Sequence, residues 1–199
     1  MAARIREARP GDRDACYDIC LRTGDSGADA SGLYEDQSLL GDVYAGPYLA
    51  VSGGLGYVAE DGAGVAGYVL GAPDTRAFEA ACEATWWPAL RARHPDPGPV
   101  PRTPDERVRW LIHYPSTAAD DVVARCPAHL HIDLLPRLQG TGAGRALMER
   151  ILERFRAEGA PGVHLGVARS NEHAVGFYRH LGFTLLAEDE HSLTFGRGL

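Results

Sequence analysis

A glycine-rich turn between a predicted strand and a predicted helix is the part of this sequence that could do chemistry. The turn is Gln139-Gly140-Thr141-Gly142-Ala143-Gly144. Glycines at the start of a helix let backbone N–H groups come close to a ligand, and the first N–H groups of a helix have no partner within it. The helix dipole adds to their attraction for an anion. The turn therefore predicts a phosphate-binding site.

The elements on either side of this turn have the patterns needed to hold it in place. Residues 128–134 (AHLHIDL) alternate apolar and polar side chains, which indicates a strand with one buried face. The helix expected after the turn, up to Glu158, has a single apolar stripe. The stripe consists of Leu147, Met148, Ile151, Leu152 and Phe155.

Length, composition and charge limit the class of protein. The 199 residues are enough for one domain with a real core, and 45% hydrophobic with 24% charged residues is typical of a globular chain. A net charge of −7 argues against nucleic acid as the main partner, but backbone amides can still attract an anionic cofactor. No apolar run reaches the length of a membrane helix, and the N-terminus lacks the apolar segment of a signal peptide. We therefore expect a cytoplasmic, single-domain protein over residues 1–199 with no membrane partner.

The four cysteines, Cys16, Cys20, Cys82 and Cys126, fit no zinc-binding spacing. Cys16 and Cys20 lie four residues apart on a predicted helix, so both would face the core. We expect reduced cysteines that pack as small buried hydrophobes.

Helices and strands are mixed along the whole chain. Strands are expected at 4–9, 57–60, 65–70, 128–134, 163–167, 183–187 and 192–195. Helices are expected from 10 to 24, within 33–48, from 143 to 158 and from 171 to 181. An insertion over about 74–125 separates the third and fourth strands, with helices expected over 75–93, 107–114 and 117–125, the last capped by Ser116 or Thr117. This order predicts an α/β or α+β sandwich around a mixed sheet.

The spacing of the glycines separates the known kinds of phosphate-binding turn. A Rossmann turn needs G-x-G-x-x-G on the first βα unit, whereas the glycines here follow G-x-G-x-G late in the chain. A P-loop needs Gly-Lys-Ser/Thr, but Gly144 is followed by Arg145 and Ala146. The pattern Q/R-x-x-G-x-G/A does fit. It is followed by a second motif, Asn171-x-x-Ala174-x-x-Phe177-Tyr178-x-x-x-Gly182-Phe183.

The two motifs, in this order and each on the expected βα unit, resemble the GNAT superfamily of acyl-CoA-dependent N-acyltransferases. The segments IREARPGDRDACYDIC, YVAEDGAGVAGYVLG, HYPSTAADDVVARCPAHLHIDLLP and FYRHLGF are similar to the acetyltransferase-like C-terminal domain of animal O-GlcNAcase and its free-standing bacterial relatives. The glycine loop is degraded in the animal domain and intact here. The resemblance implies a GNAT fold, with a mixed, mostly antiparallel sheet flanked by helices and the insertion between strands three and four. It also implies acetyl-CoA as cosubstrate.

The resemblance assigns a cofactor-binding role to the turn and to the strand before it. The amides of Gln139, Gly140, Thr141, Gly142, Ala143, Gly144 and Arg145 would hold the CoA pyrophosphate, in agreement with the chemistry of the turn. Leu134 and Leu135 would lie along the pantetheine arm, where the strand splays from its neighbour. Arg137 and Arg145 could add charge-assisted bonds, although Arg145 could equally be a solvated helix residue. Asn171 would touch the pantetheine or simply cap its helix.

Three residues are catalytic candidates. Tyr178 matches the tyrosine that protonates the departing thiolate in many relatives, and a phenol suits this role because its ordinary pKa exceeds that of a thiol. Its alternative role is packing on the buried face of a helix. His129, His131 and Asp133 alternate on one strand face, and we expect Asp133 to be the base or amine-orienting group, with His131 second and a water chain as the alternative. No metal is expected, because alternate residues on one strand seldom complete a coordination sphere.

The sequence thus predicts an acetyl-CoA-dependent N-acetyltransferase in which a small-molecule or protein amine attacks the thioester directly within a ternary complex. The alternative is a non-catalytic acetyl-CoA or CoA-binding protein that acts as a sensor or interaction domain. An enzyme needs an open, polar pocket beside the thioester, whereas a cleft filled by Trp86, Trp87 or Trp110 would favour the alternative. The insertion is expected to shape the acceptor site or a homodimer contact.

Overall fold

One sheet organises the computed structural model, which describes residues 3–199. It has seven strands in the order β1-β2-β3-β4-β5-β7-β6. The strands are β1 (Arg4–Glu7), β2 (Leu55–Asp61), β3 (Gly64–Ala72), β4 (Ala128–Leu134), β5 (Gly162–Ala168), β6 (Thr184–Glu188) and β7 (Ser192–Gly198). The helices are α1 (Arg13–Thr23), α2 (Leu39–Tyr44), α3 (Gly46–Ala50), α4 (Thr75–Thr85), α5 (Trp87–Arg93), α6 (Pro104–His113), α7 (Asp120–Arg125), α8 (Ala143–Ala157) and α9 (Glu172–His180). All neighbouring strands are antiparallel except β4 and β5.

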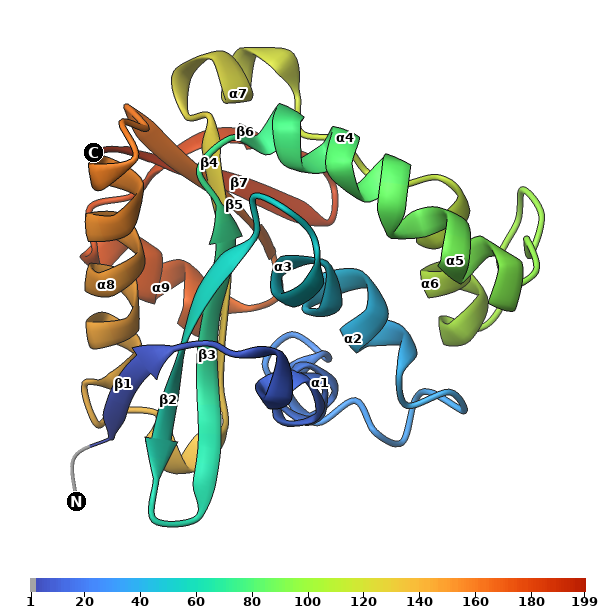
Figure 1. Ribbon diagram of the computed structural model, residues 1–199, viewed down its shortest axis with the longest axis horizontal. Coiled ribbons are helices and arrows are strands. Elements are labelled where there is room, and N and C mark those ends of the chain that lie inside the picture. The colour runs from blue at the N-terminus through green and yellow to red at the C-terminus, as the bar shows by residue number, and fades with distance from the viewer. Residues whose placement is uncertain (1–2) are drawn as a thin grey trace.

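Helices cover both faces of the sheet (Figure 1). α8 packs on β1 to β4 and lies with α9 on one side, while α1 and α3 pack on the other side. The apolar half of β4, with Ala128 and Leu130, is buried, as are Leu147 and Phe155 of α8. The element order predicted a mixed sheet, and the resemblance to the GNAT superfamily implied a mostly antiparallel one flanked by helices; both expectations are confirmed. Among residues 3–199, no helix combines enough length with enough apolar character to span a lipid bilayer.

The two parallel strands at the centre of the sheet separate soon after they meet. β4 and β5 pair only at Ala128–Val163 and His129–His164, whereas β4 stays paired with β3 up to Leu134. The Leu135 N–H donates to the Ala66 carbonyl at 2.8 Å. In an antiparallel ladder this bond makes the adjoining Leu134–Gly67 pair a non-hydrogen-bonded one, and pairs alternate along the strand. The backbone groups of Leu134 and Ile132 therefore point away from β3, into the gap that we call the β4–β5 split.

The insertion between β3 and β4 is helical, as predicted, but its boundaries differ from the expected ones. α6 begins at Pro104 rather than at 107, because Thr103 and Glu106 form a reciprocal capping box. The predicted helix over 117–125 begins only at Asp120, and neither Ser116 nor Thr117 caps it. The backbone of Ala118 is held instead by α4: its N–H donates to Glu79 at 3.2 Å and its carbonyl accepts from Arg76 at 2.6 Å.

The first third of the chain is helical where the sequence predicted, but in shorter pieces. The helix expected within 33–48 is two short helices, since Pro47 has no N–H to continue the first one and α3 begins at Gly46. The helix expected from 10 to 24 is α1 preceded by one short 3₁₀ turn at Pro10–Asp12, and Gly24 is the C-cap of α1 with a φ of −72°. The four cysteines are free and buried, as expected.

A buried carboxylate joins the insertion to the rest of the fold. The side chain of Asp42 on α2 is 2% exposed and accepts a hydrogen bond from the Tyr17 hydroxyl at 2.7 Å. Guanidinium groups of Arg13 and Arg93 lie 3.4 and 3.3 Å from its oxygens. The Asp42 carbonyl also accepts from Trp86 Nε1 at 2.9 Å. A buried charge with several partners contributes to a fold mainly because removing one member leaves the others unpaired.

Candidate active site

The glycine-rich turn presents free backbone N–H groups at the start of α8. Gly140 and Gly142 have φ values of 71° and 89°, which only glycine adopts without strain, and Gly142 is the N-cap of α8. Within residues 3–199, the N–H groups of Gly140, Gly142, Gly144 and Arg145 have no hydrogen-bond partner. No atom lies within 4 Å of a Cβ added at Gly140 or Gly142. The turn can therefore hold an anion through its backbone.

Most side chains of the turn hold the loop itself. Gln139 Nε2 donates to the Leu134 carbonyl at 3.0 Å, and the Thr141 hydroxyl donates to the Leu138 carbonyl at 2.7 Å. Arg137 is engaged away from the turn, with Nε 2.9 Å from Asp61 in the β2–β3 hairpin. These contacts leave the backbone as the main anion-binding element of the turn.

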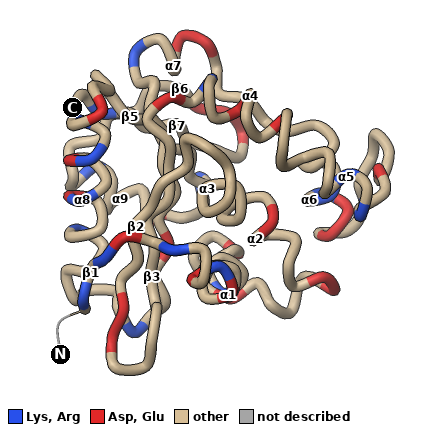
Figure 2. Tube along the Cα trace, viewed as in Figure 1, with Lys and Arg blue, Asp and Glu red and all other residues tan. Residues whose placement is uncertain are grey.

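Arg145 is the arginine of the turn that remains available. It is exposed and pairs with Glu149 one turn along α8 at 3.0 Å. Figure 2 shows acidic and basic residues alternating along this helix, as such pairs require. An exposed pair of this kind is weak, so a phosphate could replace Glu149 as partner.

The β4–β5 split extends from this turn, and its backbone differs from the expectation at one residue. Leu135 is buried and its N–H is already bonded to Ala66, so it offers no donor to a pantetheine arm. Ile132 and Leu134 point their backbone groups into the split. The Leu134 carbonyl is occupied by Gln139, which leaves the two N–H groups as the donors of this strand edge.

Tyr178 and Asp133 come from different elements, and neither lines the cavity described below. Tyr178, on α9, is 6% exposed, and its ring packs near Phe183 and Phe195. No residue among 3–199 is hydrogen-bonded to its hydroxyl. Burial, and to a lesser degree the nearby Asp133 carboxylate, raises the pKa of Tyr178 above its ordinary value of 10.0, so the phenol is protonated at neutral pH.

Asp133 lies on β4, on the strand face opposite to that of Ile132 and Leu134, and is half-buried. The hydroxyl of the fully buried Tyr68 donates to Asp133 Oδ2 at 2.5 Å. Burial raises the pKa of the Asp133 carboxyl, partly offset by the hydrogen bonds that it accepts. A carboxylate with a raised pKa is a stronger base than an ordinary aspartate.

Asn171 caps α9, which is the structural role that the sequence left open. Its Oδ1 accepts from the Ala174 N–H at 3.1 Å. Its amide nitrogen faces Gly27 of the α1–α2 loop, and the Ser26 and Ser170 hydroxyls are bonded at 2.9 Å nearby. The capping role is therefore established, and contact with a pantetheine arm stays a prediction.

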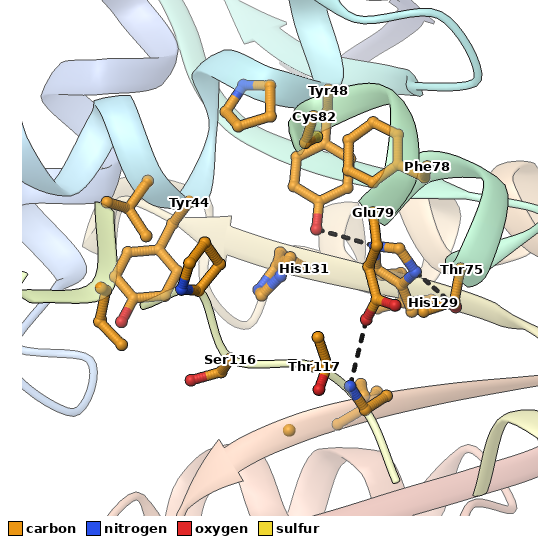
Figure 3. Close-up of a pocket in the computed structure, with 18 of the residues that line it drawn as sticks. Tyr44, Tyr48, Thr75, Phe78, Glu79, Cys82, Ser116, Thr117, His129 and His131 are labelled. Carbon is orange, nitrogen blue, oxygen red and sulfur yellow. Dashed lines mark hydrogen bonds between the residues drawn. The ribbon is translucent and has the colours of Figure 1, made fainter. Parts of the chain in front are cut away.

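A cavity of about 460 Å³ lies at the closed end of the split. Its β4 and β5 side is formed by Leu130, His131, His164, Leu165 and Gly166. The opposite side is aromatic and comes from α2 to α5: Tyr44, Tyr48, Phe78 and Trp87 (Figure 3). The loop 115–118 forms its rim. Of the two expected base candidates, His131 lines this cavity and Asp133 does not.

The three histidines at the cavity are uncharged at neutral pH. The Thr75 hydroxyl donates to the Pro127 carbonyl at 2.6 Å, so it accepts from Nδ1–H of His129 at 2.8 Å. Nε2 of His129 then accepts from the Tyr48 hydroxyl at 2.9 Å, which occupies both ring nitrogens. Burial lowers the pKa of His129 and His164, and it lowers the pKa of His131 to about 4. His129 is thus a structural residue, while His131 remains available to a ligand.

The sequence patterns did not predict the residues that line this cavity. Tyr44, Tyr48, Glu79 and His164 belong to four separate elements, and no spacing in the sequence relates them. The tryptophans do not close the cleft: Trp86 is bonded to Asp42, Trp110 packs against Tyr114 at 5.2 Å between ring centroids, and Trp87 forms part of a wall. Within residues 3–199, no group of three or more His, Cys, Asp or Glu side chains is arranged to hold a metal ion.

Known proteins are similar to this chain in sequence or in fold. The model of the acetyltransferase (GNAT) family matches residues 29–183. The crystal structure of SsHAT is 40% identical, with a TM-score of 0.92, and the match covers 100% of this chain and 98% of that one. Protein O-GlcNAcase of Rattus norvegicus is 26% identical over 190 residues, which are 94% of this chain but only 20% of that protein. A Sinorhizobium meliloti phosphinothricin acetyltransferase, solved in complex with AcCoA, shares the fold at a TM-score of 0.57 and 17% identity, over 100% of this chain and 89% of that one.

Proposed function

The chain belongs to the acetyltransferase (GNAT) family, and from this premise we propose that it is an acetyl-CoA-dependent N-acetyltransferase. The observation that carries the proposal is the β4–β5 split. It joins an anion-binding turn at one end to an open cavity at the other, with unpaired N–H groups of Ile132 and Leu134 between them. A pyrophosphate at the turn and an amide-bearing pantetheine arm along β4 fit these donors. The AcCoA complex of the Sinorhizobium meliloti enzyme, which shares the fold, supports this cosubstrate.

In the proposed reaction an amine of the acceptor attacks the thioester directly. A bond forms between the amine nitrogen and the acetyl carbon, and the bond from that carbon to sulfur breaks. The nitrogen loses a proton and the thiolate of CoA gains one, so protons and charge balance. Backbone N–H groups of β4 would stabilise the negative charge that develops on the carbonyl oxygen. Tyr178 would supply the proton to sulfur, since its raised pKa keeps the phenol protonated.

We assign the removal of the amine proton to Asp133, with His131 second. Asp133 is favoured because burial raises the pKa of its carboxyl and so makes it a stronger base than an ordinary aspartate, whereas burial lowers the pKa of His131 to about 4 and makes it a weaker base than an ordinary histidine. His131 is nearer to the acceptor, because it lines the cavity and Asp133 does not. A water molecule between the amine and Asp133 would complete this route, while His131 would orient the amine as a neutral hydrogen-bond acceptor.

The open cavity supports catalysis over the alternative of a CoA sensor. A protein that only bound acetyl-CoA would have no use for a hollow of about 460 Å³ beside the end of the split. The chain spans about a fifth of the length of the O-GlcNAcases it matches (20%), so their activities are not transferred to it.

Calorimetry with acetyl-CoA tests the first step, and saturable one-site binding is expected. Absence of binding at millimolar acetyl-CoA would refute the proposal. With an amine panel and thiol release as readout, a ternary complex predicts intersecting double-reciprocal plots and no acetylated enzyme. Arginine accounts for all 20 Lys and Arg residues, so the chain has no lysine that acetyl-CoA could modify non-specifically. An acetyl adduct on a cysteine after incubation without acceptor would instead indicate a covalent intermediate.

A further inference from the structure

The cavity beside the split carries negative charge and no compensating positive charge in its lining. Within residues 3–199 no arginine lines it, and the chain contains no lysine. Two glutamates, Glu79 and Glu83, supply the formal charges. Glu83 is neutralised by Arg91, whose two terminal nitrogens lie 2.5 and 3.0 Å from its oxygens. Glu79 is therefore the residue that decides the sign of the electrostatic potential in the cavity.

Among residues 3–199, the one cation paired with Glu79 is Arg76, and Arg76 is shared with another carboxylate. Its Oε2 accepts from Arg76 at 2.6 Å, and the same guanidinium lies 2.5 Å from Asp120. Two carboxylates and one guanidinium leave one net negative charge in this group. Glu79 Oε1 is held by the Ala118 N–H, so the carboxylate has a fixed position at the wall of the cavity (Figure 3). An anionic ligand would meet this charge with no partner of its own.

The remaining walls are apolar or uncharged. Tyr48 and Phe78 are stacked, with ring centroids 4.7 Å apart and an interplanar angle of 16°. Together with Tyr44 and Trp87 they form a broad aromatic surface. Burial lowers the pKa of the histidines opposite, so they add no positive charge at neutral pH. Aromatic faces and a carboxylate attract an ammonium group, and burial of an apolar body against the aromatic side chains favours binding.

We propose that the acceptor is a small primary amine on an aromatic or other apolar body without a carboxylate or phosphate, and that Glu79 excludes anionic acceptors. The proposal rests on the proposed function and names the substrate class of the same site. A volume of about 460 Å³ lies within the usual range of small-molecule sites. A lysine side chain of a protein would leave most of the aromatic wall unfilled. Gly166 has no side chain to separate the cavity from the split, so a bound amine can reach the thioester.

The test compares amines that differ in one group. Phenethylamine is the matched reference for two anionic analogues: phenylalanine, and phenethylamine with a carboxylate at the para position of its ring. Butylamine lacks the aromatic body, and a lysine-containing peptide represents a protein acceptor. We expect kcat/KM for phenethylamine to exceed that of both anionic analogues by at least about 100-fold, because like charges brought together without solvent repel strongly. We also expect it to exceed that of butylamine and the peptide.

Variants assign the selectivity to Glu79. Glu79→Gln keeps an oxygen for the Ala118 N–H, and we expect it to lower the preference for phenethylamine over its para-carboxylate by about tenfold or more with acetyl-CoA affinity unchanged. Glu153→Gln, on the exposed face of α8, makes the same change in net charge and should leave the preference intact. Should Glu79→Gln fail to fold, Thr117→Lys on the rim adds a cation and is expected to raise activity on the para-carboxylate.

The outcomes separate this inference from the function on which it rests. If acetyl-CoA binds but an anionic amine or the peptide is the best acceptor, or another amine releases thiol while phenethylamine does not, the substrate class is wrong while the transferase function stands. If acetyl-CoA binds and no amine releases thiol, the transferase function is wrong as well. An unchanged preference in Glu79→Gln or, if that variant does not fold, no gain in Thr117→Lys overturns the role of Glu79. If acetyl-CoA does not bind at all, both proposals fall together.

Discussion

Replacing Tyr178 by phenylalanine removes one hydroxyl from the buried face of α9 and leaves the ring in place. The ring centroids of Phe183 and Phe195 lie 5.9 and 6.4 Å from that of Tyr178, and phenylalanine retains these contacts. No residue among 3–199 is bonded to the hydroxyl, so no partner is orphaned. We therefore expect the free energy of unfolding to change by less than about 1 kcal/mol.

The expected loss of activity is larger than this change in stability. A positioned general acid is worth about 10² to 10⁴ in rate, which corresponds to roughly 3–5 kcal/mol at about 1.36 kcal/mol for each factor of ten. The lower figure applies here, because a thiol has an ordinary pKa of about 8.5 and its thiolate can leave without full protonation. Tyr178→Phe should therefore lower kcat by about 100-fold while the dissociation constant of acetyl-CoA stays within about threefold.

Thiol release at saturating acetyl-CoA and amine measures kcat, and calorimetry measures the dissociation constant. Tyr57→Phe is the matched control, since it removes a phenol hydroxyl from β2, outside the split. Since burial raises the pKa of Tyr178 above 10.0, this phenol should cause no loss of wild-type activity below that pH. An unchanged kcat, or a higher dissociation constant with kcat retained, would refute the acid role and assign Tyr178 to packing.

Three further predictions concern the turn, the base and the fold. Gly142→Ala places a side chain at a φ of 89° with free space around it. It should lower the stability in a thermal melt by about 1–2 kcal/mol and weaken acetyl-CoA binding in calorimetry. As the control, Gly176→Ala in α9 should be neutral or stabilising. Asp133 must be ionised to act as base, so kcat/KM should fall as pH decreases through its raised pKa, and Asp133→Asn should abolish this pH dependence. Because the buried charge is unfavourable, ionisation of Asp133 lowers the free energy of unfolding as pH rises through that same pKa. An Asp133→Asn protein that is more stable than wild type only at low pH would contradict this direction. Asp42→Ala leaves the Tyr17 hydroxyl without its acceptor and leaves two arginines, whose side chains are 49% and 59% exposed, without their buried partner. Because water can solvate both guanidinium groups, the variant should lower the free energy of unfolding by about 1–3 kcal/mol in urea titration, and a change under about 0.5 kcal/mol would argue against this network.

Local patterns carried the prediction of the elements around the turn. The strand at 128–134, the turn at 139–144 and the helix after it depend on periodicity and on glycine, which are properties of neighbouring residues. The order of elements and the mixed sheet were predicted for the same reason. Helix limits in the insertion and in residues 33–48 were wrong where a distant partner or a proline decided them, as at Ala118, held by Glu79 on α4.

The sequence by itself determined that this chain has a glycine-rich turn at the start of a helix, a strand before it and the two motifs of its family. It also indicated Tyr178 and Asp133 as catalytic candidates, because Tyr178 lies within the second motif and Asp133 lies on that strand. Only the tertiary structure decided the cavity beside the split, where Tyr48, Glu79 and His164 come together from elements far apart in the chain. The charge states there follow from burial and hydrogen-bond partners, which depend on three-dimensional neighbours and leave no periodic mark on the sequence.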